Sequence, residues 1–425
     1  MFVQVGDIVR VTKGPHVYEG ILMPSEGAAK DEIIILKLDT GYNVGFLKSA
    51  VSVELVDSGR GFDARMPEVE IPYDESLSSV AILGTGGTVA SKIDYSTGAV
   101  YPAFSPEELL MLVPELGSLA NIYGKEVLSI VSEDVTMKDW AHIGASVVDH
   151  ISQGFEGVVV THGTDTLHYS SAMLSFMLKD LSCPVVIVGA QRSSDRPSSD
   201  AAFNLISAVN TSTSDCAEVV VCMHGSLSDR YCSIHRGTRA RKFHTSRRDA
   251  FVSVNSRPLA KVSGAGAIEW NGPYSKAGGE DTYLDPAVDE KVSLVKAYPG
   301  AQDVLSALVD KDYHGIIIEG TGLGHAPASM HEDIRRGIEQ GISFGMTSQC
   351  INGRVNMNVY RGGRQLKEMG VMPLEDMLGE VAWCKMAWGL AHYSPGGELE
   401  TFMKTPVAGE MGATSRTDCY LGGSW

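Results

Sequence analysis

The sequence lacks the marks of several common protein classes. Its 7 cysteines contain no CxxC pair and its 12 histidines contain no HExxH motif, so the usual zinc signatures are excluded. It has no run of ~18 apolar residues, so we expect no membrane-spanning helix. The opening segment, MFVQVGDIVRV, has no basic region before an apolar core, so we expect no secretory signal.

Basic residues are also scarce. The chain has 35 Lys and Arg against 52 Asp and Glu, which gives a net charge of −17. A surface of this sign repels a phosphate backbone, so a nucleic acid should be held mainly by something else. The odd number and scattered positions of the cysteines indicate reduced thiols used as small apolar side chains, and therefore a cytoplasmic protein.

The 425 residues are enough for two or three domains. Residues 1–75 contain four or five short β-rich runs between Gly, Pro and Asp turns, including GDIVRV and EIIILKL. This pattern predicts a small SH3-like β-barrel followed by an acidic linker that contains proline. The barrel is either a ligand-binding module or an appendage that packs on a neighbouring domain or subunit.

From residue 76 the pattern changes to alternating strands and helices. Segments such as SVAILG, GVVVTHG and CPVVIVGA are apolar on both faces, and amphipathic segments such as TMKDWAHIGASVVDHIS separate them. This alternation predicts parallel-type sheets that are covered by helices on both faces. We expect a larger α/β domain at residues 76–270, and a Gly-rich linker with a smaller C-terminal α/β domain at residues 271–425.

Polar clusters follow several of the expected strands, and parallel sheets carry their sites at these strand ends. The first cluster, GTGGT, has glycines that can expose backbone N–H groups to an oxyanion, although it lacks the GK[ST] of a P-loop. The second, Ser132, Glu133 and Asp134, follows an expected strand at EVLSIV. These three residues can form a helix cap or bind a ligand.

The third and fourth clusters contain the side chains that are best suited to catalysis. In THGTDT, residues 161–166, Asp165 can act as an ordinary N-cap. A cap needs one such residue, whereas this segment also has Thr161, Thr164 and Thr166. The fourth cluster, HRGTRARKFHTSRRDAF, contains Lys242 and is either a solvated loop with ion pairs or part of a site.

Threonine, lysine and aspartate together suit amide hydrolysis. A threonine hydroxyl is a poor nucleophile until a base removes its proton. A lysine whose pKa is lowered can take that proton, an aspartate can orient the lysine, and backbone N–H groups can hold the oxyanion. These clusters must meet in one pocket for such chemistry to take place.

Together, TGGTVAS, THGTDT and KFHTSRRDAF resemble the motifs of the L-asparaginase/glutaminase family in the family's order, over about residues 78–425. The resemblance implies two asparaginase-like α/β domains with a site at the strand ends. The catalytic residues that it implies are Thr88, Thr164, Asp165, Lys242 and, on the lid DYSTGAV, Tyr95. Ser132 and Glu133 would bind the α-carboxylate and α-ammonium groups of the substrate. Thr88 is favoured over Thr164 as the nucleophile, and Tyr101 is the alternative to Tyr95.

The added β-rich segment resembles that of the family of archaeal glutamyl-tRNA(Gln) amidotransferase D subunits, since free asparaginases lack it. This resemblance implies that glutamine, or asparagine, is hydrolysed and that the ammonia goes to a partner, the E subunit of the amidotransferase. The E subunit would use ATP and Mg²⁺, hold the tRNA and convert Glu-tRNA(Gln) to Gln-tRNA(Gln), so we expect no cofactor in this chain. A homodimer within a heterotetramer is implied as well.

Other interpretations remain open at this point. A free-standing cytoplasmic L-asparaginase/glutaminase would share every catalytic residue. A non-catalytic scaffold is disfavoured because the catalytic positions are occupied. A nucleotide-binding α/β enzyme is disfavoured because the glycine-rich loop has neither the Walker lysine nor a complete GxGxxG.

Overall fold

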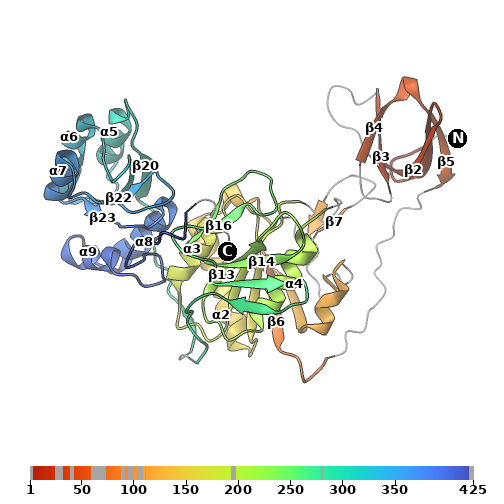
Figure 1. Ribbon diagram of the computed structural model, residues 1–425, viewed down its shortest axis with the longest axis horizontal. Helices are drawn as coiled ribbons and strands as arrows, with labels where there is room; N and C mark the ends of the chain where they lie inside the picture. The colour runs from red at the N-terminus through yellow and green to blue at the C-terminus, as the bar shows by residue number, and fades with distance from the viewer. Residues whose placement is uncertain are drawn as a thin grey trace.

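The chain forms a small β-barrel, a large central α/β domain and a C-terminal α/β domain (Figure 1). This description comes from a computed structural model. The residues that the structure describes are 3–23, 32–38, 43–58, 73–87, 91–93, 100–102, 109–110, 112–192, 198–278 and 281–420.

The first unit is an antiparallel sheet with the strand order β4-β3-β2-β1-β5, curled into a barrel (Figure 1). Alternate side chains point inward, so Val9, Val11, Leu36 and Phe46 form a buried core of their own. The expected small β-barrel is therefore confirmed. Its strands are β1 (Ile8–Lys13), β2 (His16–Met23), β3 (Ile33–Leu38), β4 (Asn43–Leu47) and β5 (Ser52–Asp57).

The large domain is built on one sheet with the order β18-β17-β14-β13-β12-β10-β6-β9. The strands from β13 to β9 are parallel, as the apolar sequences of β13, β12, β10 and β6 predict, whereas β14, β17 and β18 are antiparallel additions at one edge. The strands of this sheet are β6 (Ser79–Gly84), β9 (Asn121–Glu126), β10 (Gly157–Thr161), β12 (Val185–Val188), β13 (Val219–His224), β14 (Tyr231–Arg236), β17 (Ala260–Ser263) and β18 (Ile268–Trp270).

Helices cover both faces of this sheet. α2 (Met137–Ser152) and α3 (Leu167–Met177) share one buried core with the sheet, and α4 (Ala201–Ser212) belongs to the core on the other side. α2 begins in a capping box, because the Thr136 and Asp139 side chains each bond the other's backbone N–H. This arrangement confirms the expected α/β class and leaves the strand ends free to carry polar residues.

One expected strand is placed wrongly. The strand predicted at EVLSIV lies earlier in the chain, where β9 covers Asn121–Glu126. The apolar run fills a different role: the backbone N–H groups of Val127 and Leu128 both donate to Gly84 O, at 2.8 and 3.0 Å. Val127 and Leu128 are partly buried in a loop over the end of β6, so their apolar character reflects packing without strand pairing. Of the helix expected at SPEELLMLVPEL, residues 105–116, residues 105–108 and 111 lie outside the described residues, and its end belongs to a 3₁₀ helix, Pro114–Ser118.

The segment expected as a linker, about residues 266–286, is partly built into the large domain. β18 within it extends the sheet, and β19 (Tyr283–Leu284) pairs with β11 (Leu178–Lys179). The Trp270 and Tyr274 rings also stack, with centroids 3.9 Å apart. The domain boundaries at residues 75 and 270 stay predictions.

The C-terminal domain has a four-stranded parallel sheet in the order β20-β21-β22-β23. Its strands are β20 (Val292–Lys296), β21 (Gly315–Gly320), β22 (Ser343–Ser348) and β23 (Met372–Pro373). Its helices are α5 (Gln302–Asp310), α6 (His331–Glu339), α7 (Arg361–Met369), α8 (Gly379–His392) and α9 (Gly397–Lys404).

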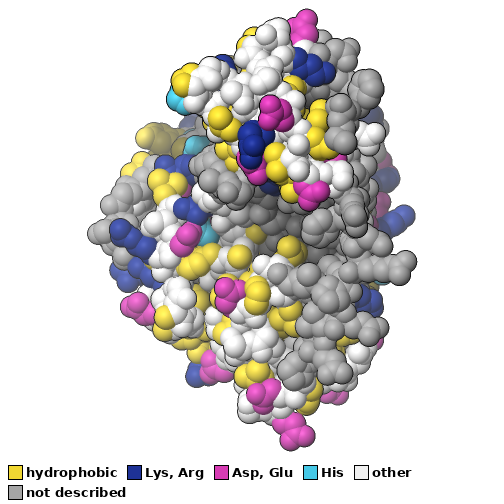
Figure 2. All heavy atoms as spheres, turned by 90° about the vertical axis from the view of Figure 1, so that its right-hand side faces the viewer, with side chains coloured by type: hydrophobic (Ala, Val, Ile, Leu, Met, Phe, Trp, Pro, Cys, Tyr) yellow, Lys and Arg dark blue, Asp and Glu magenta, His cyan; other side chains and the backbone are white. Residues whose placement is uncertain are grey.

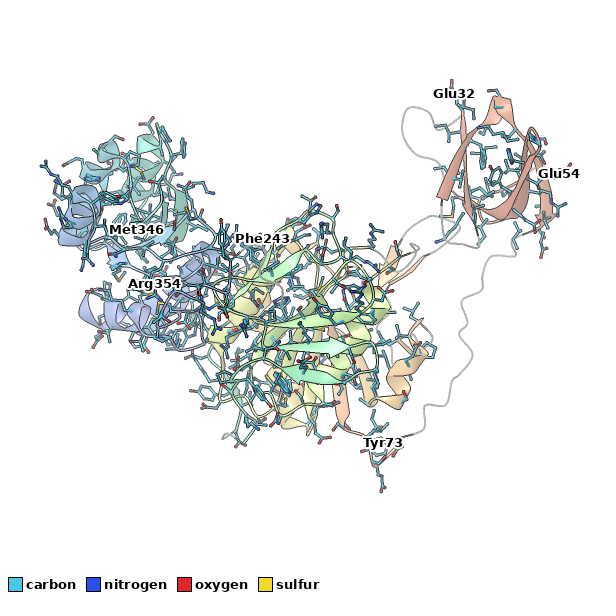
Figure 3. All side chains as sticks on the ribbon, in the orientation of Figure 1. Glu32, Glu54, Tyr73, Phe243, Met346 and Arg354 are labelled. Carbon is cyan, nitrogen blue, oxygen red and sulfur yellow. The ribbon has the colours of Figure 1, made fainter. Side chains whose placement is uncertain are left out.

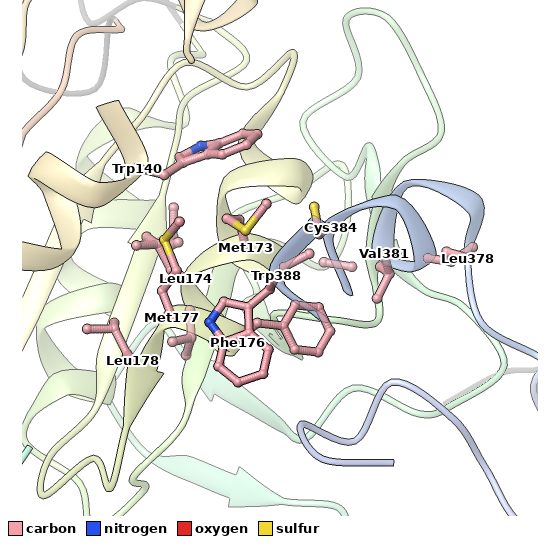
Figure 4. Packing of buried hydrophobic residues seen from close by; sticks show 14 of the residues in the cluster. Trp140, Met173, Leu174, Phe176, Met177, Leu178, Leu378, Val381, Cys384 and Trp388 are labelled. Carbon is pink, nitrogen blue, oxygen red and sulfur yellow. The ribbon is translucent and has the colours of Figure 1, made fainter. Parts of the chain in front are cut away.

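Helix α8 joins the two α/β domains. It packs on β20 and β21 of its own domain and on α3 of the large domain. Figure 4 shows Val381, Cys384 and Trp388 of α8 beside Met173 and Phe176 of α3. One hydrophobic core therefore runs through both α/β domains, while the barrel keeps a separate one.

The surface carries charges of both signs. Figure 2 shows acidic and basic side chains interspersed with apolar ones over the described part of one face. The cysteines are all free, and every one except Cys350 is buried, which fits their expected use as small apolar side chains. In the part of the chain that the structure describes, no helix is long and apolar enough to cross a membrane.

Candidate active site

The site begins where two neighbouring parallel strands end. Gly84 at the end of β6 pairs in register with Thr161 at the end of β10. The next residue, Thr85, donates to Thr161 O from its backbone N (3.1 Å) and from its hydroxyl (2.9 Å). These bonds hold the GTGG turn against the THGTDT segment.

Two glycines allow three segments to meet there. Gly86 has φ +114°, and a Cβ at this position would lie 2.2 Å from Ile130 O. Gly87 has φ +81°, and its Cβ would lie 2.9 Å from Gly163 N. Only glycine fits both the backbone conformation and the space. The GTGG turn therefore touches both the segment before Ser132 and the THGTDT segment.

The second cluster lies against the third. Ser132 and Glu133 are on a 3₁₀ turn, Ser132–Asp134, where Ser132 is buried and Glu133 is exposed. The Thr166 hydroxyl donates to Ser132 O, and a Cβ on Gly163 would lie 2.9 Å from Ser132 Oγ. Ser132 and Glu133 therefore stand beside THGTDT, with the Glu133 side chain open to a ligand.

Lys242 joins the third and fourth clusters. It ends β15 (Ala240–Lys242), which pairs with β16 (Phe251–Ser253). Its Nζ donates to Thr164 Oγ1 and to Asp165 Oδ1, each at 2.8 Å. The lysine side chain is 11% exposed, whereas that of Asp165 is 69% exposed. The next residue, Phe243, lies on the side of the large domain toward the C-terminal domain (Figure 3).

The interpretation of Asp165 as an ordinary helix cap is wrong. The N-cap of α3 is Thr166, and its side chain makes no capping bond. Asp165 instead directs its carboxylate to the Lys242 amine. The charged pair therefore does not serve to begin the helix.

Two of the expected catalytic residues, Thr88 and Tyr95, lie outside the described residues. The chain on either side of Tyr95 forms an antiparallel pair, β7 (Ser91–Ile93) with β8 (Val100–Pro102). Tyr101, the alternative lid tyrosine, sits on β8 opposite Lys92 in the register. The roles of all three residues stay predictions.

A buried hydrogen-bond network, which the sequence did not reveal, links the THGTDT segment to helices α2 and α3. Trp140 Nε1 donates to Ser170 Oγ (2.7 Å), and Ser170 Oγ lies 2.8 Å from His162 Nε2. His162 Nδ1 donates to Gly163 O (2.7 Å), so Nε2 of the neutral ring is an acceptor and the Ser170 hydroxyl donates to it. Burial lowers the pKa of His162, which keeps this ring neutral.

The basic segment, expected as a solvated loop with ion pairs or as part of a site, has an acidic partner for each of its arginines. Two of them, Arg239 and Arg241, reach the C-terminal domain. Arg241 Nη1 donates to Glu380 Oε2 at 2.5 Å. The sequence signal for Glu380 was a single carboxylate within the apolar helix GEVAWCKMAWG. The ion pairs of the segment are Arg236–Glu218, Arg239–Asp376, Arg241–Glu380, Lys242–Asp165, Arg247–Asp249 and Arg248–Asp229.

The grouping supplies a hydroxyl, an amine and a carboxylate beside two strand ends. Within the described ranges, His, Cys, Asp and Glu side chains nowhere gather into a group that could hold a metal ion. Residues 79–275 match the asparaginase N-terminal domain family, and residues 291–403 match the glutaminase/asparaginase C-terminal domain family. Residues 3–56 match the GatD N-terminal domain family.

Solved structures agree with these matches. The thermostable L-asparaginase from Thermococcus kodakarensis superposes with a TM-score of 0.70 at 31% identity, covering 79% of this chain and 100% of that one. A probable cytoplasmic L-asparaginase from Campylobacter jejuni gives a TM-score of 0.65 at 25% identity, covering 77% and 99%. The fold is therefore that of the asparaginase class.

Relatives that match the full length narrow the assignment. The D subunit of glutamyl-tRNA(Gln) amidotransferase from Pyrococcus horikoshii is 49% identical, covering 99% of this chain and 97% of that protein. The same subunit of Methanothermobacter thermautotrophicus is 47% identical, covering 96% and 94%. The chain belongs to the family of glutamyl-tRNA(Gln) amidotransferase D subunits.

Proposed function

We propose that the chain hydrolyses the side-chain amide of glutamine, or of asparagine, and delivers the ammonia to a partner subunit. The observation that carries the proposal is the Lys242 amine, placed 2.8 Å from both a hydroxyl and a carboxylate at the strand ends. The partner, the E subunit of the amidotransferase, uses ATP and Mg²⁺ to convert Glu-tRNA(Gln) to Gln-tRNA(Gln). The names of the full-length relatives and the asparaginase fold support this assignment.

The reaction has two steps. The Thr88 hydroxyl loses its proton and attacks the amide carbon, and backbone N–H groups near the GTGG turn hold the oxyanion. The carbon–nitrogen bond breaks, the nitrogen takes a proton and ammonia leaves, so that the product is an acyl ester on threonine. Water then attacks the ester and releases glutamate or aspartate. Thr164, Lys242 and Asp165 carry the protons, and Tyr95 assists the nucleophile.

Substrate and partner contacts follow from the same arrangement. Ser132 and Glu133 bind the α-carboxylate and α-ammonium groups of the substrate beside THGTDT. The net charge of −17 is unfavourable for tRNA, so the E subunit holds most of the tRNA. We also propose the cytoplasm as the compartment, and a homodimer of this chain within the complex.

The test is ammonia release from glutamine and from asparagine by the Lys242→Met variant. Loss of the proton carrier should lower kcat by about 10²- to 10⁴-fold. Lys276→Met is the matched control, because Lys276 also pairs with an aspartate, Asp215 at 2.9 Å, but on an exposed surface. Wild-type rates in Lys242→Met would contradict the proposed chemistry.

The second candidate function is a free-standing L-asparaginase or glutaminase, favoured by the full coverage of the Thermococcus L-asparaginase. The two functions differ in their dependence on the partner. Ammonia release is therefore measured with and without the E subunit, ATP, Mg²⁺ and Glu-tRNA(Gln). The amidotransferase function predicts stimulation by these components and transfer of the nitrogen to tRNA-bound glutamate. An unchanged rate without transfer would favour the free-standing enzyme.

A further inference from the structure

Glu380 connects the C-terminal domain to the strand that bears Lys242. It lies in the first turn of α8, is 1% exposed and accepts a hydrogen bond from Arg241. Arg241 directly precedes Lys242 on β15. Because neighbouring side chains of a strand point to opposite faces, Arg241 reaches α8 while Lys242 reaches Thr164 and Asp165.

The residues before Arg241 are anchored to the C-terminal part of the chain as well. The Thr238 hydroxyl donates to Ala408 O (2.8 Å), and Arg239 Nε donates to Gly409 O (2.9 Å). Arg239 Nη1 also donates to Asp376 Oδ2 (3.0 Å) in a buried ion pair. The β15–β16 ribbon has few backbone bonds of its own, so these contacts determine where β15 lies.

Glu380 also faces the other catalytic segment. Its Oε1 lies 3.9 Å from Nε2 of His168, a residue of helix α3, which begins just after Asp165 and Thr166. Burial, with help from Arg241 and other nearby cations, lowers the pKa of His168 to about 3, so the ring is neutral at pH 7 and the contact is no ion pair. Glu380 Oε1 and His168 Nδ1 are both buried without a hydrogen-bond partner. A carboxylate held in this way costs stability, which calls for a functional reason.

We propose that Glu380 is a positioning residue for the amide hydrolysis: through Arg241 it fixes β15 so that the Lys242 amine reaches both Thr164 and Asp165. The inference rests on the proposed function. Glu380 thus holds Arg241 on one face of β15 while Lys242 lies on the other, toward Thr164 and Asp165. Loss of Glu380 would therefore loosen β15.

The test uses the full chain with its partner subunit and measures kcat and KM for ammonia release. Glu380→Gln keeps the shape of the side chain and removes its charge. We expect kcat to fall by about 10- to 100-fold, because a shift of about 1 Å misplaces the proton carrier. KM should stay within about twofold, because Glu380 contacts neither Ser132 nor Glu133.

Three further variants test whether the effect passes through Arg241. Arg241→Met should lower kcat to the same extent, and the double variant should lower it no further, because both changes break one contact. Glu380→Asp keeps the carboxylate and should recover part of the lost kcat. A purely structural role would not produce this pattern in kcat alone.

Glu218→Gln is the matched control. It breaks a comparable partly buried pair, in which Arg236 Nε donates to Glu218 Oε2 at 2.7 Å. Arg236 pairs with Val220 near the start of β13, so this pair lies at the end of the sheet opposite the site. The variant should lose a similar amount of stability against urea and keep the wild-type kcat.

The outcomes separate the inference from the proposed function. A wild-type protein that releases no ammonia refutes the proposed function. An active wild type, with a folded Glu380→Gln variant at unchanged kcat, overturns the inference, and so does an equal fall of kcat in Glu218→Gln. If Glu380→Gln does not fold, Arg241→Lys decides by the same criterion, since that side chain is 28% exposed and the charge is retained.

Discussion

Lys242 meets two acceptors at the same distance, and they differ in exposure. Asp165 is largely open to water, so the ion pair contributes little to the free energy of unfolding. Thr164 is less exposed, and its hydroxyl must give up contact with water when it accepts from Lys242. The arrangement therefore adds little stability, as expected of a group placed for the proposed proton transfer.

A buried neutral histidine should also make the stability of the protein depend on pH. Burial lowers the pKa of His235 to about 4, and its Nδ1 lies 2.8 Å from Ser253 Oγ. A histidine whose folded pKa lies below its unfolded value contributes stability above about pH 6.5, and this contribution is lost as the pH falls toward 4. The loss should be roughly 3 kcal/mol over that window, at about 1.4 kcal/mol for each unit of pKa difference.

His235→Asn tests this loss, because asparagine can keep the bond to Ser253 and cannot titrate. Urea midpoints from tryptophan fluorescence between pH 7 and 4 should fall more steeply for the wild type than for the variant. The acidic side chains are common to both proteins, so their titration cancels in the difference. Parallel curves would mean that His235 does not titrate between the two states.

Single residues differ in how far the sequence could predict them. Thr164, Asp165 and Lys242 could be grouped because they stand in motifs that resemble those of one family. Glu380 could not, since it lies far along the chain from Arg241 and its own helix is patterned for burial. A contact between distant segments leaves no local spacing to detect.

At the scale of elements, the GTGG turn depends on the absence of two Cβ atoms. Gly86→Ala would place a methyl group 2.2 Å from Ile130 O at φ +114°. The turn would have to move away from Ile130, and the backbone N–H groups proposed to hold the oxyanion would move with it. We expect a large loss of ammonia release together with a loss of stability.

Comparison of Gly154→Ala with Gly86→Ala separates the effect of backbone strain from that of a steric clash. Gly154 has φ +94°, and a Cβ there meets nothing within 4 Å. Its substitution should cost about 1–3 kcal/mol from backbone strain alone and leave kcat unchanged. Urea midpoints and ammonia release are measured for both variants. Equal effects of the two substitutions on kcat would show that the fit of the turn against Ile130 is unimportant.

Elements were predictable where one periodicity dominated. The central parallel strands are buried on both faces, and continuous apolar runs such as Val158–Val159–Val160 predicted them. β9 was misplaced because an edge strand exposes half its side chains, while the loop after it is more apolar. The antiparallel edge strands were not separated from the parallel ones, since strand direction depends on distant pairing.

For the whole molecule, the separate cores predict two unfolding transitions. The barrel buries few large apolar side chains, among them Leu36 and Phe46, whereas α8 unites the two α/β domains in one larger core. The barrel should therefore unfold first in a calorimetric scan, and the α/β domains should unfold together. Tryptophan fluorescence should report the second transition alone, because residues 1–75 contain no tryptophan.

Two core substitutions assign the transitions. Leu36→Ala should lower the free energy of unfolding of the first transition only, by about 2–5 kcal/mol. Phe176→Ala should lower that of the second transition only, by about 3–5 kcal/mol. Both side chains are fully buried. A single transition that responds to both substitutions would show that the barrel and the α/β domains unfold as one unit.

The number and class of the units followed from the sequence, because strand spacing changes abruptly after the first 75 residues. The packing of α8 between the two α/β domains could not be predicted from the sequence. The sequence showed α8 only as an apolar helix near the C-terminus, and the arrangement in space shows that it faces two domains.

The path of α8 also bears on how a substrate enters. Phe176 and Trp388 are buried between the α/β domains. Separating the domains would expose this apolar surface to water, at a free-energy cost of about 25 cal/mol per Å². Separation of the two α/β domains is therefore unfavourable, and the frame around the Lys242 amine keeps its shape during the proposed reaction.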